Sequence, residues 1–391
     1  MYSKTQFGQL LEGFPRGAFE KIVATEGADK YSKGFRSWDH YVAMMYGHLS
    51  GCKSLRELET GFNAQTPHHY HLGTGPIKRS TLSDANAKRS SQLFNRVCKQ
   101  LMTRVHRTLK HELSELLFLL DSSAFVLQGP GFDEWAKHYR NNLKQGIKLH
   151  LILEGHHGSP SFSQITAMQV SDIKIGRQIP IEPGATYVFD KGYYDYNWWH
   201  QIHQQSATFV TRLKKNANIR VVKQLRVATK DSQIIEDSAI CFNNRYVKSQ
   251  TEKNQYYSTP LRRIEVKRPD KNTSLILVTN DFDRSADDIA ALYKKRWDIE
   301  LFFKWIKQNL RIKHFLGRSE NAVKIQIYTA LISYLLLQIF QQKEGVHLSL
   351  KLCLATLRVG LFQRVKTERI VSDREKRRRE QMRKIQPELA F

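Results

Sequence analysis

The sequence predicts an α/β protein, and three observations lead to this class. Two short apolar runs, Leu116–Leu120 and Ala185–Phe189, are typical of strands buried on both faces. Long segments with helical periodicity follow them, from Ser285 to about Leu310 and from Ala322 to Gln342. Strands and helices that alternate along one chain favour a sheet covered by helices.

The first 112 residues have a polar, helical pattern. Turn signals at Gly73–Pro76 precede a basic stretch, and Ser80–Arg89 has the caps and polar side chains of a helix that reads DNA after a turn. An ordinary solvated helix has the same composition, so both interpretations stay open. On the first of them, four cations are candidate DNA-binding residues: Lys78, Arg79, Lys88 and Arg89.

Further strands are expected after the first apolar run. Asp121 ends that run and Asp190 ends the run at Ala185–Phe189, while Ile147–Leu153 and Gln164–Val170 lie between them. Short alternating segments such as Leu261–Val266 indicate a β-rich insertion over residues 219–271, closed by the turn at Pro269, Asp270 and Lys271. Leu275–Thr279 is again typical of a buried strand.

The charge indicates a polyanionic partner. The chain has 62 Lys and Arg against 37 Asp and Glu, a formal net charge of +25. Such a surface gains affinity for nucleic acid by releasing counterions from phosphates. A merely soluble basic protein or a membrane-surface binder has the same balance. The basic stretch Arg374–Lys384 is either a solvated tail or a contact to the DNA backbone.

Other features narrow the class of protein. The four cysteines, Cys52, Cys98, Cys241 and Cys353, have no short paired spacing, which argues against a disulfide framework and a zinc module and favours a reducing cytoplasm. Residues 1–19 lack a signal-peptide pattern, and the apolar segment at about 327–340 is expected to be a core helix. No phosphate-binding glycine loop is present, so a nucleotide cofactor is not expected.

Three acids stand out by position: Asp121, Asp190 and Glu300. Two of them follow buried strands, where carboxylates repel one another unless a cation neutralises them. Oxygen ligands of this kind suit Mg²⁺, and pairs of such ions support phosphoryl transfer. A strand also ends in Asp simply because the chain turns there, so neither aspartate decides alone.

The predicted helix after Ser285 adds the third acid. Tyr293, Arg296, Glu300 and Lys307 are spaced by three, four and seven residues and so share one helical face. Glu300 suits a metal, while Arg296 and Lys307 suit phosphate oxygens. An amphipathic helix with internal ion pairs is the alternative.

This spacing resembles the Tyr-x2-Arg-x3-Glu-x6-Lys signature of the insertion-sequence-4 family of DDE transposases. The segments Asp121-Ser122-Ser123, Gly146–His150 and Phe189–Tyr193 resemble the two aspartate regions of that family. The resemblance covers about residues 116–334. Ser122-Ser123 departs conservatively from the Ser-Thr that many relatives carry after the first aspartate.

The resemblance implies a ribonuclease H-like catalytic core, a mixed sheet flanked by helices. It divides the chain into a helical DNA-binding region (1–112), two parts of the core (113–218 and 272–345), the β-rich insertion (219–271) and a helical, basic C-terminal region (346–391). Asp121, Asp190 and Glu300 would bind two Mg²⁺ or Mn²⁺ ions. Tyr293, Arg296 and Lys307 would contact DNA near the cut.

The implied function is cut-and-paste transposition of an insertion sequence. The enzyme would bind double-stranded DNA at the terminal inverted repeats as a homodimer, nick the ends, form and open hairpins, and join the ends to target DNA. Trp297 would occupy the space of a base that leaves the stack, unless it is a core residue. A DNA-binding protein of the same fold without chemistry is the alternative, and a repair or restriction nuclease is a third interpretation.

Overall fold

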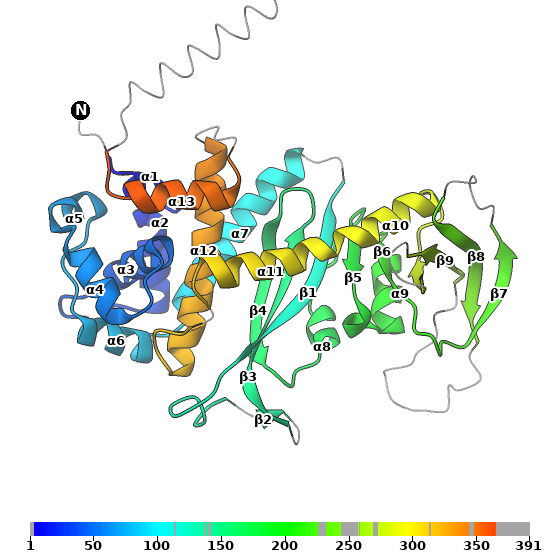
Figure 1. Ribbon diagram of the computed structural model, residues 1–391, viewed down its shortest axis with the longest axis horizontal. Coiled ribbons are helices and arrows are strands. Elements are labelled where there is room, and N and C mark those ends of the chain that lie inside the picture. Colours follow the sequence, from blue (N-terminus) through cyan, green and yellow to red (C-terminus); the bar gives the residue numbers. More distant parts are fainter. Residues whose placement is uncertain are drawn as a thin grey trace, which may run out of the picture.

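The N-terminal end of the molecule is helical. The computed structural model describes residues 4–112, 115–136, 138–139, 142–225, 232–243, 257, 259–268, 273–312, 314–343 and 348–364. Helices gather at one end (Figure 1), as the pattern of these residues predicts. They are α1 (Gln6–Leu11), α2 (Arg16–Glu26), α3 (Ser37–Ser50), α4 (Leu55–Asn63), α5 (Thr66–Leu72), α6 (Arg79–Lys88) and α7 (Gln92–Glu112).

A mixed sheet forms the middle of the molecule. The described residues contribute ten strands, in the order β2-β3-β1-β5-β6-β10-β9-β8-β7, with β4 paired to β3. Their bounds are β1 (Leu117–Val126), β2 (His138–Tyr139), β3 (Asn142–Glu154), β4 (Ser159–Ala167), β5 (Thr186–Phe189), β6 (Thr208–Arg212), β7 (Ile219–Gln224), β8 (Ile234–Phe242), β9 (Leu261–Lys267) and β10 (Ser274–Thr279).

The strand directions agree with the expected fold class. Strands β1, β5 and β6 run parallel to one another, whereas β3 and β4 are antiparallel to their neighbours. Leu117 and Leu119 of β1 pack into a core with α7, α11 (Trp297–Asn309) and α12 (Glu320–Lys343), while Phe118 and Leu120 face α9 (Tyr196–Gln204). The protein therefore has the α/β, ribonuclease H-like architecture, a mixed sheet with helices on both faces.

The β-rich segment continues this sheet. Strand β10 pairs with β6 on one side and β9 on the other, and β8 and β7 follow outward. Figure 1 shows β7, β8 and β9 at the end of the molecule opposite the N-terminal helices. The turn expected at Pro269, Asp270 and Lys271 lies outside the described residues.

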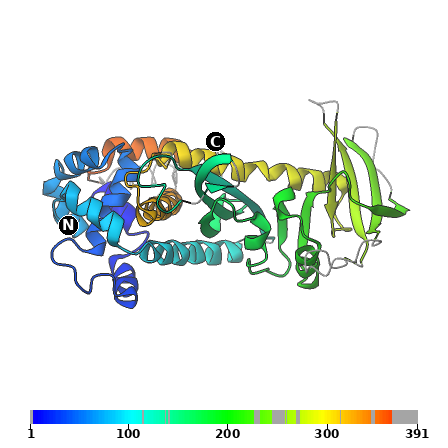
Figure 2. The same cartoon turned by 90° about the horizontal axis from the view of Figure 1, so that it is seen from below.

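The segment expected to be one long helix after Ser285 is two. Ser285 caps α10 (Ala286–Lys295) by accepting from the backbone N–H of Asp288, as predicted, but the helix stops at Arg296 before α11 begins. The two helices run one after the other along one side of the molecule (Figure 2). Arg296 therefore stands at a junction rather than in the middle of a helix.

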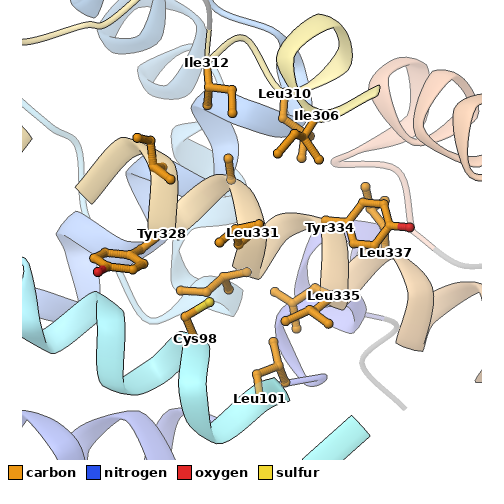
Figure 3. Packing of buried hydrophobic residues seen from close by; sticks show 14 of the residues in the cluster. Cys98, Leu101, Ile306, Leu310, Ile312, Tyr328, Leu331, Tyr334, Leu335 and Leu337 are labelled. Carbon is orange, nitrogen blue, oxygen red and sulfur yellow. The ribbon is translucent and has the colours of Figure 1, made fainter. Parts of the chain in front are cut away.

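Helix α12 is the central core helix. By length and composition it could cross a membrane, yet 83% of its most apolar 18-residue stretch is buried inside the protein. Leu331 and Leu335 pack between Leu101 of α7 and Ile306 at the end of α11 (Figure 3). The expectation of a core helix here is confirmed.

Two boundaries differ from the sequence prediction. Strand β1 does not end at Asp121 but continues to Val126, because residues 121–126 pair with β3 even though their burial is lower. The strand expected at Gln164–Val170 ends at Ala167, where the chain turns. Near the C-terminus, α13 (Leu350–Gly360) is described, whereas Arg374–Lys384 lies outside the described residues.

Candidate active site

Two of the predicted acids are neighbours in the sheet. Strands β1 and β5 pair in parallel with Leu120 beside Phe189, so the next residues, Asp121 and Asp190, also lie side by side. Leu119 belongs to the core that contains α11 and Leu120 to the opposite core. Because successive side chains point to opposite faces, Asp121 points toward the α11 side. Asp190 follows β5 and accepts a hydrogen bond from the Gly192 N–H, 2.7 Å.

Glu300 approaches this face from α11, and Arg296 bridges it to the first aspartate. The Arg296 guanidinium donates to a Glu300 carboxylate oxygen at 2.6 Å and lies 3.9 Å from Asp121 Oδ2. Arg296 therefore lies between Glu300 and Asp121, which are 179 positions apart in sequence, while Asp190 lies beside Asp121 through the pairing of β1 and β5. Arg296 supplies a positive charge at a place where neighbouring carboxylates repel one another.

The electrostatics of Asp121 report this convergence. The pKa of Asp121 is raised from its usual value to about 7, chiefly by burial; the charges of Asp190 and Glu300 contribute in the same direction, while the Ser122 N–H and Arg296 act in the opposite direction. A carboxyl with such a pKa gains from a nearby cation.

The residues fit a divalent cation by chemistry. Asp121, Asp190 and Glu300 offer only carboxylate oxygens, the ligands that Mg²⁺ and Mn²⁺ prefer. Across the described ranges, no group of three or more His, Cys, Asp or Glu side chains is spaced as a ready-made metal cage. In this conformation the counter-charge comes from Arg296.

A pocket of about 400 Å³ opens beside these acids. Seven of its eight lining residues are polar or charged, and they include Asp121, Glu300 and Lys307. The Lys307 ammonium donates to Ser123 Oγ at 2.7 Å and to the Ala124 carbonyl at 3.1 Å, which ties α11 to β1. The sequence prediction quoted Ser122 and Ser123 only as part of the segment around the first aspartate, and it gave no site role to the other lining residues Phe303, Lys304 and Gln308. The spacing of Lys304, one turn after Glu300, was the signal that could have found it.

Two predicted aromatic residues flank Arg296. Tyr293 is buried, and its ring centroid lies 5.9 Å from the guanidinium carbon; burial raises the pKa of its phenol. Trp297 is 56% exposed, and its ring centroid lies 6.0 Å from the same guanidinium carbon. Trp297 is therefore not a core residue, which leaves its indole accessible to a ligand.

The four cations expected to bind DNA in the N-terminal region differ in their surroundings. Lys78 and Arg79 are exposed at the start of α6, and Lys88 is exposed beside Asp84. Arg89 instead donates to the backbone carbonyls of Phe35 and Arg36. The geometry therefore favours a structural role for Arg89, which fastens the loop before α3.

Arg79 borders a second pocket of about 660 Å³. Its cationic lining residues are Lys53, Arg56 and Arg79, and Phe315 and Leu316, which follow α11 in the chain, also line it. Phe315 packs against Phe125, and the Lys307 ammonium lies 4.6 Å from the centroid of the Phe125 ring. The second pocket is thus linked to the acidic pocket through Phe315, Phe125 and Lys307.

Comparison of the sequence with known proteins identifies a family and several relatives of this chain. A family profile described as a transposase DDE domain matches residues 112–336, which contain Asp121, Asp190 and Glu300. A domain of unknown function matches residues 2–75. The first match covers more than half of the chain.

Three relatives share about two thirds of the chain. A Sinorhizobium fredii protein named as transposase y4zB is 41% identical over 258 residues, 66% of this chain and 70% of that protein. A Geobacillus stearothermophilus protein named as a transposase for insertion sequence element IS5377 is 27% identical over 69% of this chain and 70% of its own length. A Synechocystis protein named as a transposase for insertion sequence element IS4SA is 28% identical over 66% of this chain and 71% of its own length.

Proposed function

Because this chain belongs to the insertion-sequence transposases with a DDE domain, we propose that it cuts the ends of its element and joins them to target DNA in the bacterial cytoplasm. The observation that supports the proposal is that Asp121 and Glu300 line one pocket on either side of Arg296, with Asp190 next to Asp121 in the sheet. These carboxylates would hold two Mg²⁺ or Mn²⁺ ions. Such ions activate the attacking oxygen and stabilise the leaving oxygen in phosphoryl transfer.

The protein's own residues would bind and orient the DNA strand. Lys307 lines the pocket and Arg296 is paired with Glu300 at its edge, so both cations could contact phosphate oxygens. The Tyr293 ring lies against the Arg296 guanidinium. Trp297 is exposed beside Arg296 and offers a stacking surface for a base displaced during hairpin formation. Two element ends must be held together, so a homodimer on DNA is part of the proposal.

The second pocket suggests the path of the DNA away from the cut. Lys53, Arg56 and Arg79 are exposed, and no side-chain hydrogen bond or ion pair engages them within the described part of the chain. Their charges remain available for phosphates. A strand that leaves the acidic pocket past Lys307 and Phe315 reaches them directly. Lys78 and Lys88, at the two ends of α6, are further candidates for contacts to DNA phosphates.

The proposed function is tested by incubating the full chain with linear DNA that carries the ends of its own element. With Mg²⁺ or Mn²⁺ we expect nicks at the element boundaries, hairpin-ended products on a denaturing gel, and joining to a target plasmid. Chelation by EDTA should stop all three. Binding without cleavage under either metal would instead favour the DNA-binding protein without chemistry.

The proposed DNA path predicts a change in salt dependence. Replacing Lys53, Arg56 and Arg79 together by Ala should reduce the slope of log affinity against log salt by about 2 to 3, since each lost phosphate contact removes about 0.9. The measurement is fluorescence anisotropy with a labelled element end at several salt concentrations. The control replaces Lys21, Lys33 and Lys99, exposed cations that do not line the pocket, and should leave the slope nearly unchanged. An equal reduction in both variants would contradict the path.

A further inference from the structure

A fourth carboxylate, Asp172, lies next to Ser122, the residue of β1 that follows Asp121. Asp172 is the first residue of the short helix α8 (Asp172–Gly176). It accepts a hydrogen bond from the Ser122 hydroxyl at 2.7 Å, while the Ser122 backbone N–H donates to Asp121 Oδ1, also at 2.7 Å. One serine thus connects the two carboxylates through two different groups.

Asp172 also packs against the turn that carries Asp190. A Cβ placed on Gly192 would stand 2.8 Å from Asp172 Oδ2 and 2.9 Å from Asp190 Oδ1. Real Cβ atoms essentially never approach oxygen atoms so closely. Only glycine at position 192 therefore leaves room for the Asp172 and Asp190 carboxylates in their present positions. The position of Asp172 therefore limits where Asp190 can lie.

Strand β3 holds Asp172 in this place. The Lys148 ammonium donates to Asp172 Oδ1 at 3.1 Å and to the Val170 carbonyl at 3.0 Å. His150 is buried, its Nε2 engages Thr166 Oγ1 at 2.9 Å, and its otherwise unpartnered Nδ1 faces Asp172 Oδ1 at 3.4 Å. The pairing of β1 with β3 puts His150 directly opposite Ser122.

We propose that Asp172 is a positioning residue that sets the spacing between Asp121 and Asp190, by holding Ser122 on one strand and the Gly192 turn beside the other. The inference rests on the proposed function, because the spacing matters to the reaction only if the two acids share divalent ions. Small displacements of reacting groups cost large factors in rate. Asp172 suits this role because it contacts Ser122 of β1, Lys148 of β3 and the Gly192 turn at the same time.

The first test is Ser122→Ala, which removes the hydroxyl link but keeps Asp121, Asp190 and the Asp172–Lys148 pair. We expect single-turnover cleavage to fall about 10-fold or more, with DNA affinity and the urea midpoint of unfolding close to wild type. The Mg²⁺ concentration for half-maximal cleavage should rise, and calorimetry should show weaker Mn²⁺ binding. Ser122→Thr restores a hydroxyl and should recover most of the rate.

Asp172→Asn is the second variant, because it keeps an acceptor for Ser122 but loses the charge that pairs with Lys148. It should show the same weakening of Mn²⁺ binding. Ser161→Ala, whose hydroxyl only reaches the Ile152 carbonyl at 3.5 Å, is the matched control and should behave as wild type.

The outcomes separate the inference from the proposed function. Wild-type cleavage and Mn²⁺ binding in both Ser122→Ala and Asp172→Asn would overturn the inference and leave the function standing. A joint loss of stability and DNA affinity with unchanged metal dependence would assign Asp172 to anchoring α8 alone, which also overturns it. If the wild-type protein cleaves no element end, the proposed function fails, and Mn²⁺ binding still reports on the role of Asp172.

Discussion

Glu300→Gln, Asp121→Asn and Asp190→Asn are each expected to lower cleavage of element ends by a factor of about 1,000 or more while DNA binding persists. Each change keeps the shape of the side chain and removes a negative charge that faces Arg296 or its neighbouring acids. An amide binds a divalent cation far less well than a carboxylate does. The measurement is single-turnover nicking in Mg²⁺ alongside a gel-shift assay of affinity.

The matched control for these variants lies on the same helix. Asp298 is exposed in the first turn of α11, two residues before Glu300, and does not line the pocket. Asp298→Asn should cleave within a small factor of wild type. Normal cleavage by any one of the three acid variants would remove that residue from the proposed ligand set.

Asp237→Ala is expected to lower the free energy of unfolding by about 3–5 kcal/mol, because it leaves a buried guanidinium without its partner. Arg262 of β9 forms two parallel bonds to Asp237 of β8, at 2.9 and 2.7 Å, and both side chains are buried. The remaining arm of Arg262 donates to the Arg284 carbonyl at 2.5 Å, just before α10. The pair thus joins the outer strands to the helix that leads to the active site.

Urea unfolding followed by circular dichroism measures this loss, and the neighbouring ion pair provides the control. Glu236 pairs with Arg263 at 2.6 Å, but its side chain is one third exposed. Glu236→Ala should therefore cost no more than about 1 kcal/mol. Replacing Arg262 and Asp237 together by Met and Leu should recover much of the loss. Equal effects of Asp237→Ala and Glu236→Ala would contradict the assignment.

Sequence reasoning succeeded where a periodic pattern determines the structure. Continuous apolar runs placed β1 and β5 and so put Asp121 and Asp190 near each other, and helical spacing grouped Glu300 with Arg296 and Lys307. It failed where the result depends on contacts between distant segments. Composition does not tell that Arg89 folds back onto two carbonyls, or that Arg296 interrupts its helix.

Asp172 was missed for the same kind of reason. It stands 50 positions after Ser122 at the start of the short helix α8, and only the folded arrangement of β1, β3 and α8 brings the two together. The cations Lys53 and Arg56 were missed because their shared pocket with Arg79 depends on Phe315 and Leu316 from the far end of the chain.

The parallel pairing of Leu120 with Phe189 also limits how this enzyme can vary. Side chains alternate along a strand, so losing or gaining one residue in Thr186–Phe189 would turn Asp190 toward the Trp198 core instead of Asp121. A substitution along these strands can lower activity by any amount, whereas deleting one residue moves Asp190 to the other face of the sheet and should abolish activity. Length variation among related enzymes should consequently fall in the connections and not within these two strands.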